Sequence, residues 1–151
     1  IHRDIAGSFA PLLIRDLTTA AISFSGNEAL AATVRQSGMP ELAAVRPEGG
    51  SVRIVLVASL EEAADVMSHH GAGHSDAIVT ENRTAAVRFA ALVDSACLYV
   101  NASMRFTDGH QFGMGAHLAI STGRLHARGP IGIDELTTTR YFVTGKGQTV
   151  Y

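Results

Sequence analysis

The chain has 151 residues, of which 46% are apolar and 17% are charged, and its formal net charge is −2. This length allows one domain with a hydrophobic core. The small net charge and the scattered basic residues give no reason to expect a nucleic-acid partner. No apolar run approaches the ~20 residues that span a bilayer, so no membrane partner is expected. The single cysteine excludes an intrachain disulfide and is typical of a cytoplasmic protein.

Helices and strands are expected to alternate from the first residues onward. Residues 3–18 are predicted to form an amphipathic helix, because apolar residues recur there at helical spacing, namely Ile5, Phe9, Leu12, Leu13 and Leu17. A strand is expected over 20–24. Ser25 and Glu28 resemble a capping box for a helix near 26–36. The segment 38–50 is expected to be irregular.

The second half of this pattern is clearer. Residues 52–57 read VRIVLV and predict a strand, and Ser59 with Glu62 is expected to cap the helix that follows. The buried face of that helix is predicted to consist of Leu60, Ala63, Ala64 and Met67. A short strand over 77–79, a helix over 82–93 and a strand over 97–101 complete the series. The helix over 82–93 is expected to face inward through Ala85, Phe89, Leu92 and Val93.

The alternation of strand and helix predicts an α/β fold with crossover connections and a parallel sheet. Ligands of such sheets bind outside the carboxyl ends of the strands. A glycine-rich loop begins at Asn101, where a predicted strand ends, so this loop marks the expected pocket. Gly109, Gly113 and Gly115 allow its backbone to turn sharply and to approach a ligand closely.

Two polar side chains of this loop each have two interpretations. Arg105 either clamps a carboxylate or a phosphate through its planar guanidinium, or pairs with Asp108 and shapes the loop. Asn101 either orients a substrate or ties down its own turn.

The other reactive side chains are expected to be structural. Cys97 lies within an apolar strand and is expected to be buried and inert. The cluster His69, His70 and His74 suits the end of a helix better than a metal site, so no metal is expected. His117 and His126 are expected to be structural as well. Gly113 and Gly115 fail as a dinucleotide fingerprint because a strand-like segment follows them.

Four sequence blocks resemble, in the same order, the C-terminal part of the gamma-glutamyl phosphate reductase family. The blocks are HSDAIVTENR (74–83), VDSACLYVNAS (93–103), RFTDG (105–109) and LHARGP (125–130). The resemblance to this branch of the aldehyde dehydrogenase superfamily implies an α/β fold with a parallel three-layer sheet. Residues 1–136 would form the C-terminal part of the catalytic domain. Residues 137–151 would form a C-terminal β arm, either a hairpin or an extended strand, that joins a homo-oligomer.

The resemblance also implies an activity. Enzymes of this family use NADPH to convert gamma-glutamyl phosphate to glutamate 5-semialdehyde in proline biosynthesis, through a nucleophilic cysteine. Residue 1 is expected to be a cut through a longer protein, whose preceding part holds that cysteine and most of the NADPH site, so residues 1–151 alone are expected to be inactive. The glutamyl group would lie near five residues of the loop region: Asn101, Arg105, Phe106, Gly109 and Phe112.

Two residues depart from the family pattern, which has glycine where His110 stands and glutamate where His117 stands. Two alternative functions remain open at this point. The chain is either a non-catalytic interaction or oligomerisation module on the same scaffold, or part of an aldehyde dehydrogenase homologue that acts on another acyl substrate.

Overall fold

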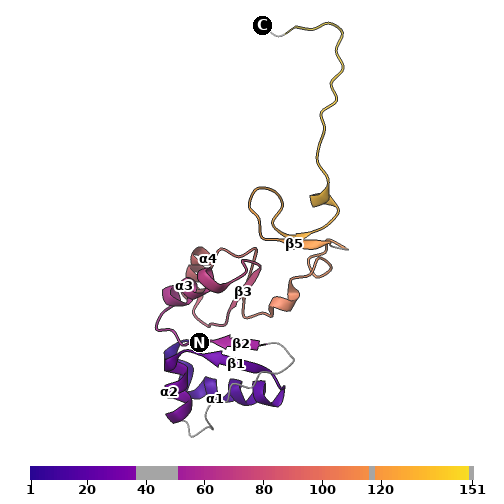
Figure 1. The fold of residues 1–151 in the computed structure, drawn as a ribbon. Coiled ribbons are helices and arrows are strands. Elements are labelled where there is room, and N and C mark those ends of the chain that lie inside the picture. The colour runs from indigo at the N-terminus through magenta and orange to yellow at the C-terminus, as the bar shows by residue number, and fades with distance from the viewer. Residues whose placement is uncertain (37–50, 116–117, 150–151) are drawn as a thin grey trace. The chain divides into compact units, whose positions relative to one another are not determined.

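The computed structural model describes residues 1–36, 51–115 and 118–149. The chain divides into two compact units, Ile1–His70 and Gly71–Tyr151. Each unit contains one pair of parallel strands (Figure 1). The predicted irregular segment 38–50 lies outside the described residues.

The first unit contains one crossover between parallel strands. In β1 and β2, Gly26 pairs with Ile54 at the carboxyl end of the pair. An isolated bridge also joins His2 to Val57, so the first residues run beside the segment that follows β2. The elements of this unit are α1 (Arg3–Thr19), β1 (Ser23–Gly26), α2 (Glu28–Gln36), β2 (Ser51–Ile54) and α3 (Leu60–His70).

The predicted first helix is confirmed as α1, but its buried face differs from the expected one. Side chains spaced four apart are buried at Ala6, Ala10 and Ile14. They join a core cluster with Leu30, Val34, Ile54 and Leu56, and Leu13 and Leu17 pack against that cluster. The other three apolar residues of the predicted face are exposed, namely Ile5, Phe9 and Leu12. The small alanines let α1 approach its neighbours closely, and this selects their face.

The start of the first strand was predicted too early. Ala20 and Ala21 end α1 instead: their N–H groups donate to the carbonyls of Asp16 and Thr18. Ala21 has a left-handed φ of 54°, which turns the chain before β1 begins at Ser23. The second strand was predicted too long, since β2 ends at Ile54.

Asn27, not Ser25, caps α2. Its Oδ1 accepts from the N–H of Leu30 at 3.2 Å, which satisfies one of the free donors at the helix start. The same oxygen accepts from the N–H of Leu56 at 3.2 Å, and Nδ2 donates to the carbonyl of Leu56 at 3.1 Å. One side chain therefore starts a helix and also joins the segments that follow β1 and β2.

The predicted cap of α3 is present with a small change. The N–H of Glu62 donates to Ser59 Oγ at 3.1 Å, as expected for the first half of a capping box. The Glu62 carboxylate reaches back to the N–H of Ala58, one residue earlier than the standard box. Of the predicted face, Ala64 is buried, and Leu60, Ala63 and Met67 are half-buried.

The second unit contains another parallel pair with a helical crossover. β3 and β4 pair from Ser75 with Cys97 to Ile78 with Val100. Asn82 caps α4, whose Phe89 is buried, as predicted. An antiparallel pair, β5 with β6, follows. The elements are β3 (Ser75–Ile78), α4 (Arg83–Leu92), β4 (Cys97–Val100), the 3-10 helix η1 (Met104–Phe106), β5 (Ala119–Ser121), β6 (Gly129–Ile131) and the 3-10 helix η2 (Asp134–Leu136).

The prediction of an α/β fold with parallel strands and helical crossovers is confirmed. Both parallel sheets are two-stranded within the described residues, so the three-layer sheet stays a prediction. The division into 1–136 and 137–151 also stays a prediction. No helix in the part of the chain that the structure describes is long and apolar enough to span a bilayer.

Asn27→Ala is expected to lower the free energy of unfolding by about 2 kcal/mol, because it removes the cap and both bonds to Leu56. Asn27→Asp keeps the acceptor and is expected to cost about 1 kcal/mol, since it places an oxygen against the Leu56 carbonyl. Urea unfolding followed by circular dichroism measures both. Asn82→Ala, which removes only a cap, is the matched control at about 1 kcal/mol. Equal losses for the two alanine variants would contradict the bridging role of Asn27.

Candidate functional site

The loop that follows β4 starts with a side-chain amide that bonds a neighbouring strand end. Asn101 has a left-handed φ of 55°, a conformation that asparagine tolerates better than most residues. Its Oδ1 accepts from the N–H of Thr80 at 2.8 Å, and its Nδ2 donates to the Thr80 carbonyl at 2.8 Å. The structure therefore favours the structural interpretation of Asn101, although its amide fastens the β3–α4 loop and not only its own turn.

Together these two bonds use one of the two N–H groups of the amide and one of the two lone pairs on its oxygen. Asn101 is itself exposed. The remaining half of the amide therefore lies at the surface, at the carboxyl end of the β3–β4 pair.

The loop was predicted to lie at the carboxyl ends of the strands. Beyond Asn101 it leaves this position. η1 contacts β3. Thr107 Oγ1 then lies 2.8 Å from the hydroxyl of Ser75, the first residue of β3. The loop thus runs back beside β3 toward its amino end, and only its first residues mark the edge where ligands were expected to bind.

Arg105 and Phe106 lie on the outer side of this loop. The Arg105 side chain is exposed, and no hydrogen bond or ion pair joins its guanidinium to any residue in the described ranges. Asp108 does not act as its partner: the Asp108 carboxylate accepts from the N–H of His110 at 2.7 Å. Phe106 is 52% exposed. The Arg105 cation and the neighbouring Phe106 ring are therefore both exposed to solvent.

The glycines of the loop have different roles. Gly109 is buried. Gly113 and Gly115 have left-handed φ values of 74° and 71°, so they provide the sharp turns that the sequence predicted. The N–H of Gly113 donates to the carbonyl of His110, which closes a turn within the loop. Phe112 is 50% exposed.

An ion-pair cluster that the sequence did not predict joins Asp94 to the segment that connects the antiparallel strands β5 and β6. Arg128 bonds the Asp94 carboxylate at 2.8 Å and the Asp94 carbonyl at 3.0 Å, and Arg124 also bonds that carboxylate. These bonds, first that of Arg128 and then that of Arg124, lower the pKa of Asp94 from 3.8 to about 2. Arg128 lies in the LHARGP block, which indicated the family resemblance. Nothing in that block indicated the contact with Asp94.

The remaining reactive side chains take structural positions where the structure describes them. Cys97 is buried, as predicted. α3 ends at His70, His69 Nδ1 lies 2.7 Å from the Asp65 carbonyl, and His74 Nδ1 lies 2.6 Å from Ser75 Oγ. His126 Nε2 lies 2.8 Å from the Glu135 carbonyl. His117 lies outside the described residues.

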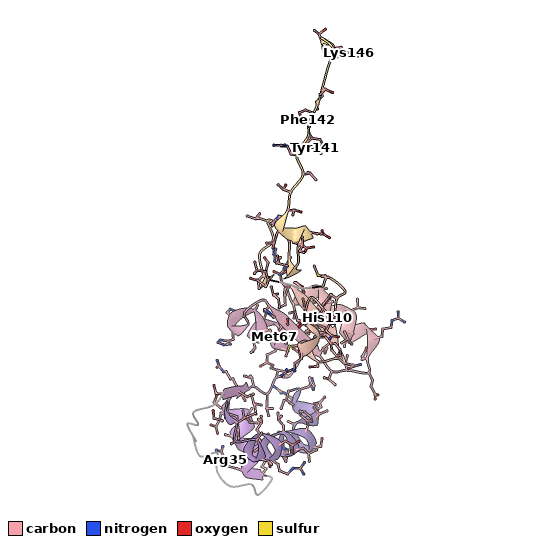
Figure 2. The ribbon with its side chains drawn as sticks, turned by 90° about the vertical axis from the view of Figure 1, so that its right-hand side faces the viewer. Arg35, Met67, His110, Tyr141, Phe142 and Lys146 are labelled. Atoms are coloured by element: carbon pink, nitrogen blue, oxygen red, sulfur yellow. The ribbon has the colours of Figure 1, made fainter. Side chains whose placement is uncertain are left out.

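The segment after η2 has no helix or strand over 137–149. The hairpin that the sequence analysis considered is therefore not formed within these residues. Its large apolar side chains are almost fully exposed, with Tyr141 at 91%, Phe142 at 85% and Val143 at 88%. Figure 2 shows Tyr141, Phe142 and Lys146 along one extended stretch of chain. Such a segment has the composition of a strand and lacks the pairing.

The comparisons with known proteins point to one kind of protein. No protein-family model matches the chain. A gamma-glutamyl phosphate reductase from Ligilactobacillus salivarius is 39% identical over 151 residues, which cover 98% of this chain and 36% of the relative. The reductase from Thermobifida fusca is 41% identical over 153 residues, with coverages of 97% and 36%. The chain thus spans about a third of the length of the curated relatives that it matches.

Solved structures give the same answer. The crystal structure of gamma-glutamyl phosphate reductase from Thermotoga maritima matches with a TM-score of 0.84 and 36% identity, over 99% of this chain and 37% of that one. The enzyme from Saccharomyces cerevisiae matches with a TM-score of 0.55 and 28% identity, over 70% of this chain and 29% of that one.

The matched proteins are reductases, so the fold and the loop described above occur in the class of oxidoreductases. More particularly, this chain is similar to the C-terminal part of gamma-glutamyl phosphate reductase. The resemblance expected from its four sequence blocks is therefore confirmed.

The Asp94 cluster predicts a specific response to acid. Because the folded-state pKa of Asp94 is lowered to about 2, its stabilising effect is fully present above about pH 4 and is lost as the pH falls through 2. A carbon NMR titration of the Asp94 carboxyl group is expected to give a midpoint near that value. Arg128→Met is expected to raise the midpoint more than Arg124→Met. A wild-type midpoint near 4 would contradict the cluster.

Proposed function

We propose that this chain is the C-terminal part of a cytoplasmic enzyme that reduces gamma-glutamyl phosphate to glutamate 5-semialdehyde with NADPH, a step of proline biosynthesis. The similarity over 98% of the chain to reductases of that name supports the proposal. The observation that carries the assignment of a site is the exposed guanidinium of Arg105, which no described residue engages, on a loop whose start is fixed by Asn101.

In this proposal the loop region binds the glutamyl end of the substrate through Asn101, Arg105, Phe106, Gly109 and Phe112. Arg105 pairs with the α-carboxylate, because a guanidinium can bond both carboxylate oxygens at once. Phe106 and Phe112 contact the methylene groups and exclude water from that ion pair. Asn101 holds the loop start through Thr80, and its second amide N–H faces the substrate.

The covalent chemistry is assigned to residues outside this chain. A thiolate attacks the acyl carbon of gamma-glutamyl phosphate, phosphate leaves, and a thioester forms. When bound, NADPH would supply the hydride that the reduction to the aldehyde requires. The single cysteine of the chain, Cys97, is buried in β4 and unsuited to this attack.

The glycine pair of the loop does not form a dinucleotide fingerprint. Gly113 and Gly115 are followed by a strand, β5, instead of the helix that binds a pyrophosphate. We therefore assign the NADPH site to the part of the protein that precedes this chain.

We further propose that residues 137–151 pair with a second subunit as a β arm and that this chain forms part of a parallel three-layer sheet. The exposed side chains from Tyr141 to Val143 support the arm, because an unpaired apolar strand gains stability by joining a sheet edge.

Arg105→Ala in the full enzyme is expected to raise KM for gamma-glutamyl phosphate about ten- to a hundredfold, the factor for one hydrogen-bonded ion pair. Arg105→Lys keeps the charge but loses the planar fork, so an intermediate KM is expected. Steady-state NADPH absorbance measures both. Arg15→Ala removes an exposed arginine that pairs with the adjacent Asp16 and serves as the matched control. An unchanged KM in Arg105→Ala would contradict the assigned role.

The same assay separates the alternatives. A non-catalytic module would leave the full protein without NADPH oxidation for any acyl phosphate. A homologue for another acyl substrate would oxidise NADPH with a different acyl phosphate and not with gamma-glutamyl phosphate.

Purified residues 1–151 are expected to show no turnover, since their one thiol is buried and lies in a strand. Cys97→Ala in the full enzyme is expected to retain turnover. NADPH absorbance at substrate saturation measures both. If residues 1–151 show turnover and Cys97→Ala abolishes it, the nucleophile belongs to this chain. That result would contradict the proposal that the nucleophile lies outside it.

A further inference from the structure

A chain of hydroxyl groups connects the loop to both strands of the β3–β4 pair. Thr107 Oγ1 lies 2.8 Å from Ser75 Oγ on β3 and 2.8 Å from Tyr99 Oη on β4. Ser75 Oγ lies in turn 2.6 Å from His74 Nδ1. In the strand register Ser75 pairs with Cys97, and Tyr99 follows two residues later, so Ser75 and Tyr99 lie on the same face of the pair.

Thr107 is placed where the loop changes from exposed to covered. Arg105 and Phe106 before it are exposed, whereas Thr107 and Asp108 are half-buried and Gly109 is buried. The backbone up to this point is fixed mainly by short-range bonds, such as that from the N–H of Thr107 to the Met104 carbonyl at 3.0 Å. The Thr107 hydroxyl is therefore a long-range connection between the η1 turn and the sheet.

The bonds of the Thr107 hydroxyl differ from those of a hydroxyl that donates only to a carbonyl of its own helix. Thr19, for example, donates to the carbonyl of Arg15 on the same exposed helix at 2.9 Å. The Thr107 hydroxyl instead bonds two side chains on two strands, and a serine could make both bonds whereas a valine could make neither. Its loss would release η1 from β3 and β4 together.

We infer that Thr107 is a positioning residue whose hydroxyl, held between Ser75 and Tyr99, fixes the η1 turn and thereby aims Arg105 at the substrate. The inference rests on the proposed function for its last step only. The Thr107 hydroxyl does not touch the substrate in this account. It sets how often the Arg105 guanidinium is found in its binding position, so its removal weakens binding more than chemistry.

The test uses the full protein with four variants: Thr107→Val, Thr107→Ser, Tyr99→Phe and the control Thr19→Val. Hydrogen exchange of the backbone amides over 104–109 reports the loop without reference to activity. Thr107→Val is expected to accelerate this exchange about three- to tenfold, the factor for one neutral hydrogen bond, and Tyr99→Phe to do so as well. Thr107→Ser and Thr19→Val are expected to match the wild type.

The kinetic measurement follows in the same variants. KM for gamma-glutamyl phosphate is expected to rise about three- to tenfold in Thr107→Val with kcat within about twofold of the wild type, and Thr107→Ser restores KM. Because Thr107→Val and Tyr99→Phe remove partners of one network, their combined effect is expected to be smaller than the product of the single effects.

Each contrary outcome has one meaning. Unchanged exchange in Thr107→Val overturns the inference at its structural step. Faster exchange with an unchanged KM in Thr107→Val overturns the positioning role of Thr107. In that case a raised KM in Arg105→Ala still supports the proposed role of the loop in substrate binding. An unchanged KM in both variants contradicts that role as well.

Discussion

Both units of the chain depend on an asparagine amide that continues a parallel strand pair beyond its last backbone bond. In the first unit Gly26 pairs with Ile54, and the next residue, Asn27, bonds the N–H and the carbonyl of Leu56. In the second unit Val100 pairs with Ile78, and Asn101 bonds both backbone groups of Thr80. The offset is the same in both cases. A side-chain amide has the donor and the acceptor of a peptide group, so it replaces one more rung of the ladder where the chain must already turn away.

The position of each asparagine amide determines where the segment after the strand can leave the sheet. Parallel strands of four residues form few backbone bonds, and the segment after each strand leaves the sheet at once. The amide holds the two departing segments together, so α2 can start directly at Asn27 and the glycine-rich loop can start directly at Asn101. The loop then returns to β3 through Thr107, which gives it two fixed points with Arg105 between them. An exposed cation on a loop held at both ends keeps its direction better than one on a free loop.

The sequence predicted the local structure well and the long-range contacts poorly, for identifiable reasons. The helices, the parallel crossovers and the buried Cys97 follow from periodicity and strand composition, which act over a few residues. The inward face of α1 was wrong because two stripes of that helix are apolar, and only packing against its neighbours selects the alanine stripe. Asn27 and Leu56 are 29 positions apart, and Arg128 and Asp94 are 34 positions apart. No local sequence pattern predicts bonds over such separations. At the site, the glycines indicated the turns, and Thr107, the second fixed point of the loop, was not singled out.

The burial of the single thiol affects how readily oxidants and alkylating reagents modify Cys97. Gly129 has a left-handed φ of 89°, and a Cβ built there would lie 3.8 Å from the Cys97 sulfur, so strand β6 passes directly over this side chain. The sulfur is shielded on that side by a backbone that Arg128 fastens to Asp94. Oxidation or alkylation of Cys97 is therefore expected to become faster when β6 detaches, so the rate of thiol modification would report this local opening.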